Sequence, residues 1–152
     1  MISPEVAAFL EAGQSIYIGT CDRALRPEGA RAIAATVDEG RASLTLYVPQ
    51  VAVHRVLPNL EATGQAAVVF ARPSDDHAYQ VKGTFMSARP AEARERAVVE
   101  AQWKGFQQNL DIIGVSHRLV ERWPHWPCMA VRLQVTALFN QTPGPGAGAS
   151  VA

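Results

Sequence analysis

The stretch at residues 42–48 reads ASLTLYV and gives the clearest strand pattern in the chain. Leu44, Leu46 and Val48 alternate with polar or amphipathic side chains, which is the two-residue period of a strand with one buried face. The triplet Asp-Glu-Gly at residues 38–40 predicts a tight turn before this strand, and residues 30–38 predict a second strand before the turn. A strand, a short turn and another strand predict antiparallel pairing.

Working outward from this pair, similar patterns predict four further strands, at residues 14–22, 65–71, 79–88 and 129–139. Helical spacing predicts an opening helix through residue 12, two short turns at residues 50–64, a long helix at residues 91–113 and a short helix starting near residue 116. Gly83 inside a strand predicts a bulge or the close approach of another group.

Six mostly antiparallel strands, with one long helix inserted before the last, favour a mainly β, α+β fold in the form of a small barrel. The barrel would occupy residues 1–140 as one domain, because a chain of 152 residues fits a single domain. Residues 141–152 are rich in proline, glycine and alanine and predict an extended tail.

The charge balance and the cysteine content limit the kinds of molecule and compartment that suit this protein. The chain carries 14 basic and 14 acidic residues, and this balance argues against nucleic acid and anionic membrane as partners. Cys21 and Cys128 form no metal-binding motif, and two reduced thiols suit a reducing compartment. The opening residues resemble no signal peptide, and no apolar run is long enough to span a membrane. We therefore expect a cytoplasmic protein.

Several clusters that could carry chemistry have simpler explanations. The run Asp75-Asp76-His77 is typical of a hairpin loop, because aspartate favours turns. His125 and Cys128 lack the two further ligands of a structural zinc site, so we expect no metal site. No arrangement of residues indicates a hydrolase, and we name no catalytic residue. The three tryptophans predict packing in the core or at an interface, with Trp123 or Trp126 as an alternative cover for a bound ring.

Three segments, taken in order, resemble the pyridoxamine 5′-phosphate oxidase-like superfamily of FMN-binding split β-barrels. The first is the strand pair GARAI at residues 29–33 and LTLYVP at residues 44–49. The second is VHRVLPNLEATGQAAVV at residues 53–69, and the third is YQVKG at residues 79–83. The likeness extends over about residues 3 to 140.

This resemblance implies a homodimer with FMN bound at the interface and a small-molecule redox substrate. It would place Arg31 at the flavin or its phosphate and residues 47–49 beside the isoalloxazine ring. It would place two basic residues at the phosphate and two polar residues of a later strand at the polar edge of the flavin or its phosphate. The cofactor-binding residues implied in this way are Arg31, Tyr47, Val48, Pro49, His54, Arg55, Gln80 and Lys82. A phosphate with nearly two negative charges favours arginine, lysine and backbone amides.

The sequence departs from the family in the turn after Pro49, which reads PQVAV and lacks the hydroxyl that many members place there. No C-terminal residues match those that the oxidase itself uses for its substrate, so that activity is not expected. We therefore keep, beside a flavin-dependent oxidoreductase, a non-enzymatic binding or stress-response module with a weakened or lost flavin site. Related barrels also imply deazaflavin or haem as a ligand, the latter with His54, His77, His117 or His125 as axial ligand.

Overall fold

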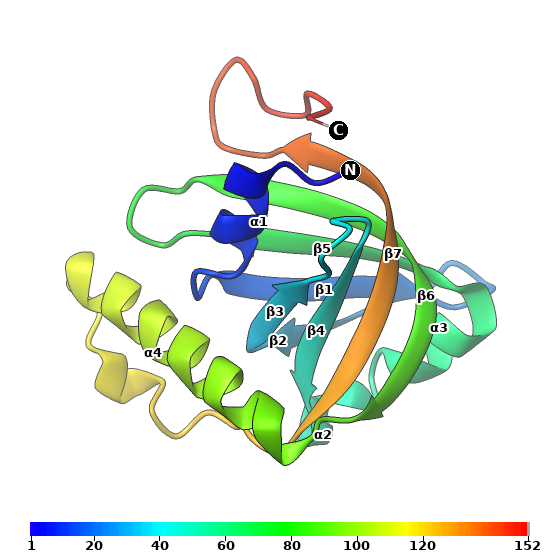
Figure 1. Ribbon diagram of the computed structural model, residues 1–152, viewed down its shortest axis with the longest axis horizontal. Helices are drawn as coiled ribbons and strands as arrows, with labels where there is room; N and C mark the ends of the chain where they lie inside the picture. Colours follow the sequence, from blue (N-terminus) through cyan, green and yellow to red (C-terminus); the bar gives the residue numbers. More distant parts are fainter. Residues whose placement is uncertain (152) are drawn as a thin grey trace.

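The computed structural model describes residues 1–151, in which seven antiparallel strands form one curled sheet in the order β2-β1-β5-β6-β7-β4-β3 (Figure 1). The strands are β1 (Ser15–Cys21), β2 (Pro27–Ala32), β3 (Ala34–Val37), β4 (Ser43–Pro49), β5 (Gln65–Ala71), β6 (Ala78–Pro90) and β7 (Cys128–Asn140). The helices are α1 (Pro4–Leu10), α2 (Gln50–Val53), α3 (Leu57–Thr63) and α4 (Arg96–Ile112), with 3-10 turns at Ala93–Glu95 and His117–Leu119. The α+β class and the insertion of a long helix before the last strand are confirmed.

The expected number of six strands is wrong, because the strand predicted at residues 30–38 divides at Ile33. On one side of Ile33, β2 pairs with β1, and on the other side β3 pairs with β4. The amide of Ile33 itself donates to the carbonyl of Tyr47 at 2.8 Å. Since β2 and β3 are the two ends of the sheet order, this single-residue connection curls the sheet toward a barrel.

The barrel interior is lined by the alternating apolar residues that the sequence predicted. Leu44, Leu46 and Val48 of β4 are at most 1% exposed, and the other central strands contribute in the same way. Helix α1 adds Leu10, and the α2–α3 segment adds residues that include Leu60. Burial of these side chains is the main favourable contribution to folding.

Local side-chain and backbone chemistry explains where several elements begin and end. The hydroxyl of Ser3 accepts from the amide of Val6 at 3.3 Å and caps α1. Helix α3 ends at Gly64, which has a left-handed conformation. The long helix is preceded by a 3-10 turn, where the side chains of Glu92 and Glu95 form a capping box.

The expected bulge at Gly83 is also confirmed. The pairing of β6 with β7 shifts register between Lys82 and Gly83, and it shifts again between Phe85 and Ser87. A Cβ atom at Gly83 would lie 2.9 Å from the carbonyl oxygen of Gln134, so the strands come closer there than a side chain allows.

The tail after β7 turns back instead of running on as an extended segment. The amide of Val151 donates to the carbonyl of Leu138 at 3.0 Å, and Ser150 forms an isolated bridge with Phe139. The tail thereby covers part of the β7 edge that β4 does not reach.

Helix α4 lies on the outside of the sheet, across β3, β4 and β7 (Figure 1). Its apolar side chains Val99, Trp103 and Phe106 pack on outward-facing residues of the sheet and form a second core there. The buried residues on the sheet side of this second core are Ile33, Ala34, Tyr47, Cys128 and Ala130.

The free edge of β3 is closed by side chains. The amide group of Gln102 on α4 accepts from the Ala35 amide at 3.0 Å and donates to the Ala35 carbonyl at 2.7 Å. A carboxylate oxygen of Glu11 accepts from the Val37 amide at 2.6 Å. Gln102, which is 7% exposed, therefore replaces the strand that would otherwise pair with this edge.

We expect Gln102→Leu to lower the free energy of unfolding by roughly 2–5 kcal/mol, because a buried N–H and a buried C=O of Ala35 would each lose its partner. Gln108→Leu, the same change at an exposed position of α4, should shift it by no more than about 0.5 kcal/mol. Urea denaturation of both variants measures the difference. Equal stabilities of the two variants would contradict the role given to Gln102.

Candidate functional site

The guanidinium group of Arg31, on the outward face of β2, lies among aromatic rings and hydroxyls. It donates to the Tyr17 hydroxyl at 3.0 Å and to Ser15 Oγ at 3.3 Å. Its central carbon lies 4.6 Å from the ring centre of Tyr17, 4.8 Å from that of Trp123 and 5.4 Å from that of Phe106. Within residues 1–151, no carboxylate lies within ion-pair distance of Arg31.

Arg31 lines a cleft of about 170 Å³ at the start of α2. The other lining residues are apolar and come from the β2–β3 junction, the end of β4, α2 and the segment between α4 and β7, namely Ile33, Pro49, Val51, Ala52, Trp123 and Pro124. The cleft therefore combines one cation with a flat apolar wall, which suits a planar ring that carries an anionic group. From the sequence, a role for Trp123 as cover for a bound ring is only an alternative to packing. The contact of Trp123 with Arg31 joins residues that are far apart in the sequence.

The three residues expected beside the flavin ring have different surroundings. Pro49 lines the cleft, Val48 points into the barrel core, and Tyr47 is buried beneath α4. The hydroxyl of Tyr47 lies 3.0 Å from Oε1 of Glu95, and burial is the main reason why the pKa of Tyr47 is raised. Of these side chains, Pro49 alone reaches the cleft beside Arg31.

His54 and Arg55 follow α2, where His54 is the C-terminal cap residue. Both side chains are exposed, and neither lines the cleft. A role for them at a phosphate remains a prediction from the resemblance.

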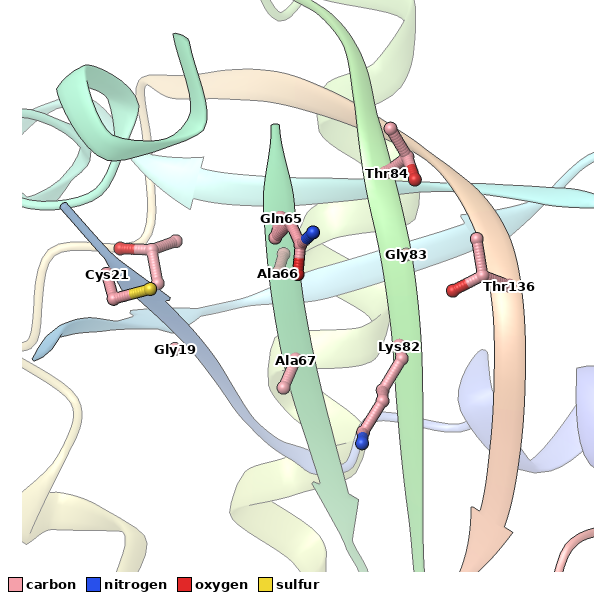
Figure 2. A pocket seen from close by; sticks show the side chains of 10 residues that line it. Gly19, Cys21, Gln65, Ala66, Ala67, Lys82, Gly83, Thr84 and Thr136 are labelled. Atoms are coloured by element: carbon pink, nitrogen blue, oxygen red, sulfur yellow. The ribbon is translucent and has the colours of Figure 1, made fainter. Parts of the chain in front are cut away.

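Gln80 and Lys82 lie on the outward face of β6. Register pairs Gln80 with Val69 of β5 and Lys82 with Ala67, so both stand on the face of the sheet that also carries Tyr17 and Arg31. Lys82 lines a cleft of about 520 Å³, whose other lining residues include the small residues Gly19 of β1 and Ala67 of β5. Figure 2 shows Lys82 on β6 next to Ala67 on β5. The Lys82 ammonium lies 5.3 Å from the ring centre of Phe139. Strands β1 and β5 lie between Lys82 on β6 and Arg31 on β2, so one chain does not bring the two cations together.

The four histidines lie apart from one another. His77 packs against the rings of Phe9 and Tyr79, and His125 stacks on Trp103 at 5.6 Å. His117 is paired with Asp111 at 2.9 Å. In the described part of the chain, no three histidine, cysteine, aspartate or glutamate side chains come together as a metal site would require.

Asp75 and Cys128 belong to two clusters for which the sequence favoured a structural role. Asp75 accepts from the His77 amide at 3.1 Å and pairs with Arg72 at 2.7 Å, so it stabilises the loop between β5 and β6. These contacts, with Arg72 the largest cause, lower the pKa of Asp75 to about 2. Cys128 is buried, and burial raises the pKa of its thiol to about 12, which makes it a poor nucleophile.

Glu95, just before α4, forms several charged and polar contacts. Its two oxygens accept from Arg89 at 2.7 and 2.8 Å, and Oε2 also accepts from the Glu92 amide at 2.7 Å. Arg89 is the main reason why the pKa of Glu95 is lowered to about 2. This network connects β6 to the start of α4 and places Glu95 over Tyr47.

The curled antiparallel sheet and its outer helix form a split β-barrel, the fold that is also found in solved structures described as FMN-binding or pyridoxamine 5′-phosphate oxidase-related proteins. No family model matches the sequence, and no curated protein matches it either. The fold assignment therefore comes from solved structures. Within residues 1–151, no helix has both the length and the apolar character needed to cross a membrane.

Three solved structures illustrate the likeness. HupZ of Group A Streptococcus is 17% identical over 97% of this chain and 100% of its own, with a TM-score of 0.57. An F420 reductase is 12% identical over 90% of this chain and 98% of its own, with a TM-score of 0.60. An FMN-binding protein from Syntrophomonas wolfei is 12% identical over 88% of this chain and 82% of its own, with a TM-score of 0.56. The likeness concerns the fold.

The Glu95 network predicts a specific loss of stability in acid. The pKa of Glu95 is about 2 in the folded protein, whereas its ordinary value is 4.5. The ionised Glu95 therefore contributes fully to the free energy of unfolding above pH 4.5, and this contribution is lost as the pH falls toward 2. We expect Glu95→Gln to lower stability at neutral pH and to flatten the decline below pH 4.5. Urea midpoints measured across this range test it, with Glu121→Gln, at an exposed position, as the control. A decline in Glu95→Gln as steep as in the wild type would contradict the assignment.

Proposed function

We propose that the protein binds FMN at a site shared by two copies of the chain and uses the flavin in an oxidoreduction. The observation that carries the proposal is Arg31, a cation held on a strand by hydroxyls and aromatic rings and without a carboxylate partner among the described residues. Such a guanidinium is available to a phosphate oxygen, which arginine binds in a fork geometry. Two of the solved structures with this fold bear the descriptions FMN-binding protein and F420 reductase.

The residues at the cleft fit the parts of FMN. Arg31 offers the charge for the phosphate, while Trp123 and Pro49 offer apolar area to the ring. These residues would bind and orient the cofactor and exclude water from one of its faces. The flavin, when bound, supplies the electron or hydride transfer itself, so the proposal requires no acid or base from the protein.

The size of the cleft supports a second copy of the chain. Ligand sites that enclose a molecule of this size measure about 300–1,000 Å³, whereas the cleft at Arg31 has about 170 Å³. Beside it, the outer sheet face exposes Tyr17 at 51% and Val69 at 37%. A second copy packed on this face would bury these side chains and would bring its own Gln80 and Lys82 to the shared site.

We expect Arg31→Gln to weaken FMN binding about tenfold or more, because a hydrogen bond to a charged group contributes about 1.5–3 kcal/mol. Arg94→Gln removes a surface arginine whose side chain is 80% exposed and should leave the affinity unchanged. Quenching of flavin fluorescence on titration gives both dissociation constants. Equal affinities of the two variants would remove Arg31 from the site.

The same titration separates the proposal from its alternatives. A protein with a visible flavin band, or with saturable quenching of added FMN, supports the proposal. If both signals are absent, the non-enzymatic module that the turn after Pro49 suggests becomes the better explanation. A Soret band on reconstitution would favour haem. Saturable binding of a deazaflavin, with no response to FMN, would show that the proposed cofactor is wrong and that the protein binds a related ring instead.

The shared site makes a separate prediction about assembly. We expect the wild type to sediment as a dimer and Val69→Arg to shift it toward monomer, because the change puts an unpaired charge into an apolar contact. Val98→Arg makes the same change on α4, at a side chain that is 39% exposed, and should leave the dimer intact. Analytical ultracentrifugation distinguishes these states. A wild type that sediments only as monomer would exclude the shared site.

A further inference from the structure

A second cleft, of about 360 Å³, lies on the outer face of β3, β4, β7 and β6. It shares no lining residue with the cleft at Arg31, and the resemblance gives no role to the residues that form it. Its polar side chains are Thr36, Asp38, Thr45, Ser87, Arg89 and Arg132.

The register of four strands builds this cleft. Tyr47 of β4 lies opposite Ala34 and Ala130, and this row of the sheet is covered by α4. Two residues further along, Thr45 lies opposite Thr36 on one side and Arg132 on the other. This next row faces the same way as the covered row, because side chains alternate along a strand.

The second bulge of β6 completes the row. After Phe85 pairs with Leu133, the register shifts by one residue, and Ser87 rather than Met86 lies opposite Arg132. The shift places a hydroxyl beside the guanidinium, where unbroken pairing would have placed a thioether. Bulges that redirect a side chain in this way are frequent next to binding sites.

Within the described residues, Arg132 forms no ion pair in the cleft. Its Nε and one terminal nitrogen lie 3.2 and 3.0 Å from Ser43 Oγ, and among residues 1–151 no carboxylate lies within ion-pair distance of it. Arg89 is already paired with Glu95. The one carboxylate in the wall is Asp38, whose Oδ1 accepts from the amides of residues 42 and 43 at 2.9 and 2.6 Å. The pKa of Asp38 is lowered mainly by the hydrogen bond from the Ser43 amide, and to a smaller extent by the charge of Arg132 in the same wall.

We propose that this cleft is a binding site for a small oxyanion, the carboxylate or phosphate group of a metabolite. Arg132 provides the charge, and the hydroxyls of Thr45 and Ser87 on either side of it provide neutral hydrogen bonds. The remaining N–H groups of the guanidinium suit such a group, because arginine binds carboxylate and phosphate oxygens in the same fork geometry. The site lies on paired strands, so the backbone positions that carry its donors are fixed before a ligand arrives. It is independent of the proposed flavin site.

The test is a titration of the full chain with inorganic phosphate and, separately, with succinate, followed by two-dimensional amide NMR. We expect saturable shifts of the amides of Thr45, Ser87 and Arg132 with at least one of the two anions, and the tighter anion identifies the group recognised. Arg132→Gln should weaken binding about tenfold or more. Arg26→Gln, a surface arginine paired with Asp22, should not change it.

Two further variants keep the proposal open to contradiction. Ser87→Ala removes one hydroxyl and should weaken binding several-fold, while Arg31→Gln should leave oxyanion binding unchanged. If Arg132→Gln does not fold, Arg132→Lys retains the charge and loses the fork, and it should bind more weakly than the wild type. Shifts confined to the residues around Arg31, unsaturable shifts with both anions, or wild-type affinity in the Arg132 variants would overturn the site.

Discussion

The structure depends on the way in which the edge strand β3 is satisfied. A short strand at the end of a sheet exposes amide and carbonyl groups that need partners, and here a side-chain amide provides them. Gln102 makes both hydrogen bonds with Ala35, while Glu11 binds the next outward-pointing amide, that of Val37. The helix that carries Gln102 is therefore fixed to the sheet by directional hydrogen bonds as well as by the apolar side chains of the same buried face. An apolar contact alone would not determine the position of α4 along the strand, because it has no direction.

That position of α4 organises the outer face of the sheet. The helix covers the row that contains Ala34, Tyr47 and Ala130. It leaves the polar row of Thr45 and Arg132 exposed beyond it, and its Phe106 lies beside the guanidinium of Arg31. Two separate clefts, one mainly apolar and one mainly polar, are thus a consequence of where one helix lies. Glu95, at the start of the helix, links the same arrangement to β6 through Arg89.

Features that depend on neighbouring residues could be predicted from the sequence. The alternation at Leu44, Leu46 and Val48, the cap at Ser3 and the bulge at Gly83 each follow from local backbone chemistry. The change of pairing partner at Ile33 could not be predicted, because residues 30–38 have the pattern of one continuous strand and the change depends on strands far away in the sequence. The contact of Trp123 with Arg31 and the placement of Ser87 beside Arg132 are likewise long-range. They depend on a loop conformation and on a register shift that no local pattern encodes.

The distribution of charge connects the two clefts. The chain is neutral as a whole, but its seven strands carry four cations, Arg31, Lys82, Arg89 and Arg132, and one carboxylate, Glu28. The other acidic residues lie in helices, turns and loops. Within the described residues, Arg89 is the only one of the three strand arginines with a carboxylate within ion-pair distance. Arg31 and Arg132, which hydroxyls and, for Arg31, aromatic rings hold in place, are therefore the two positions at which our proposals put an anionic group of a ligand.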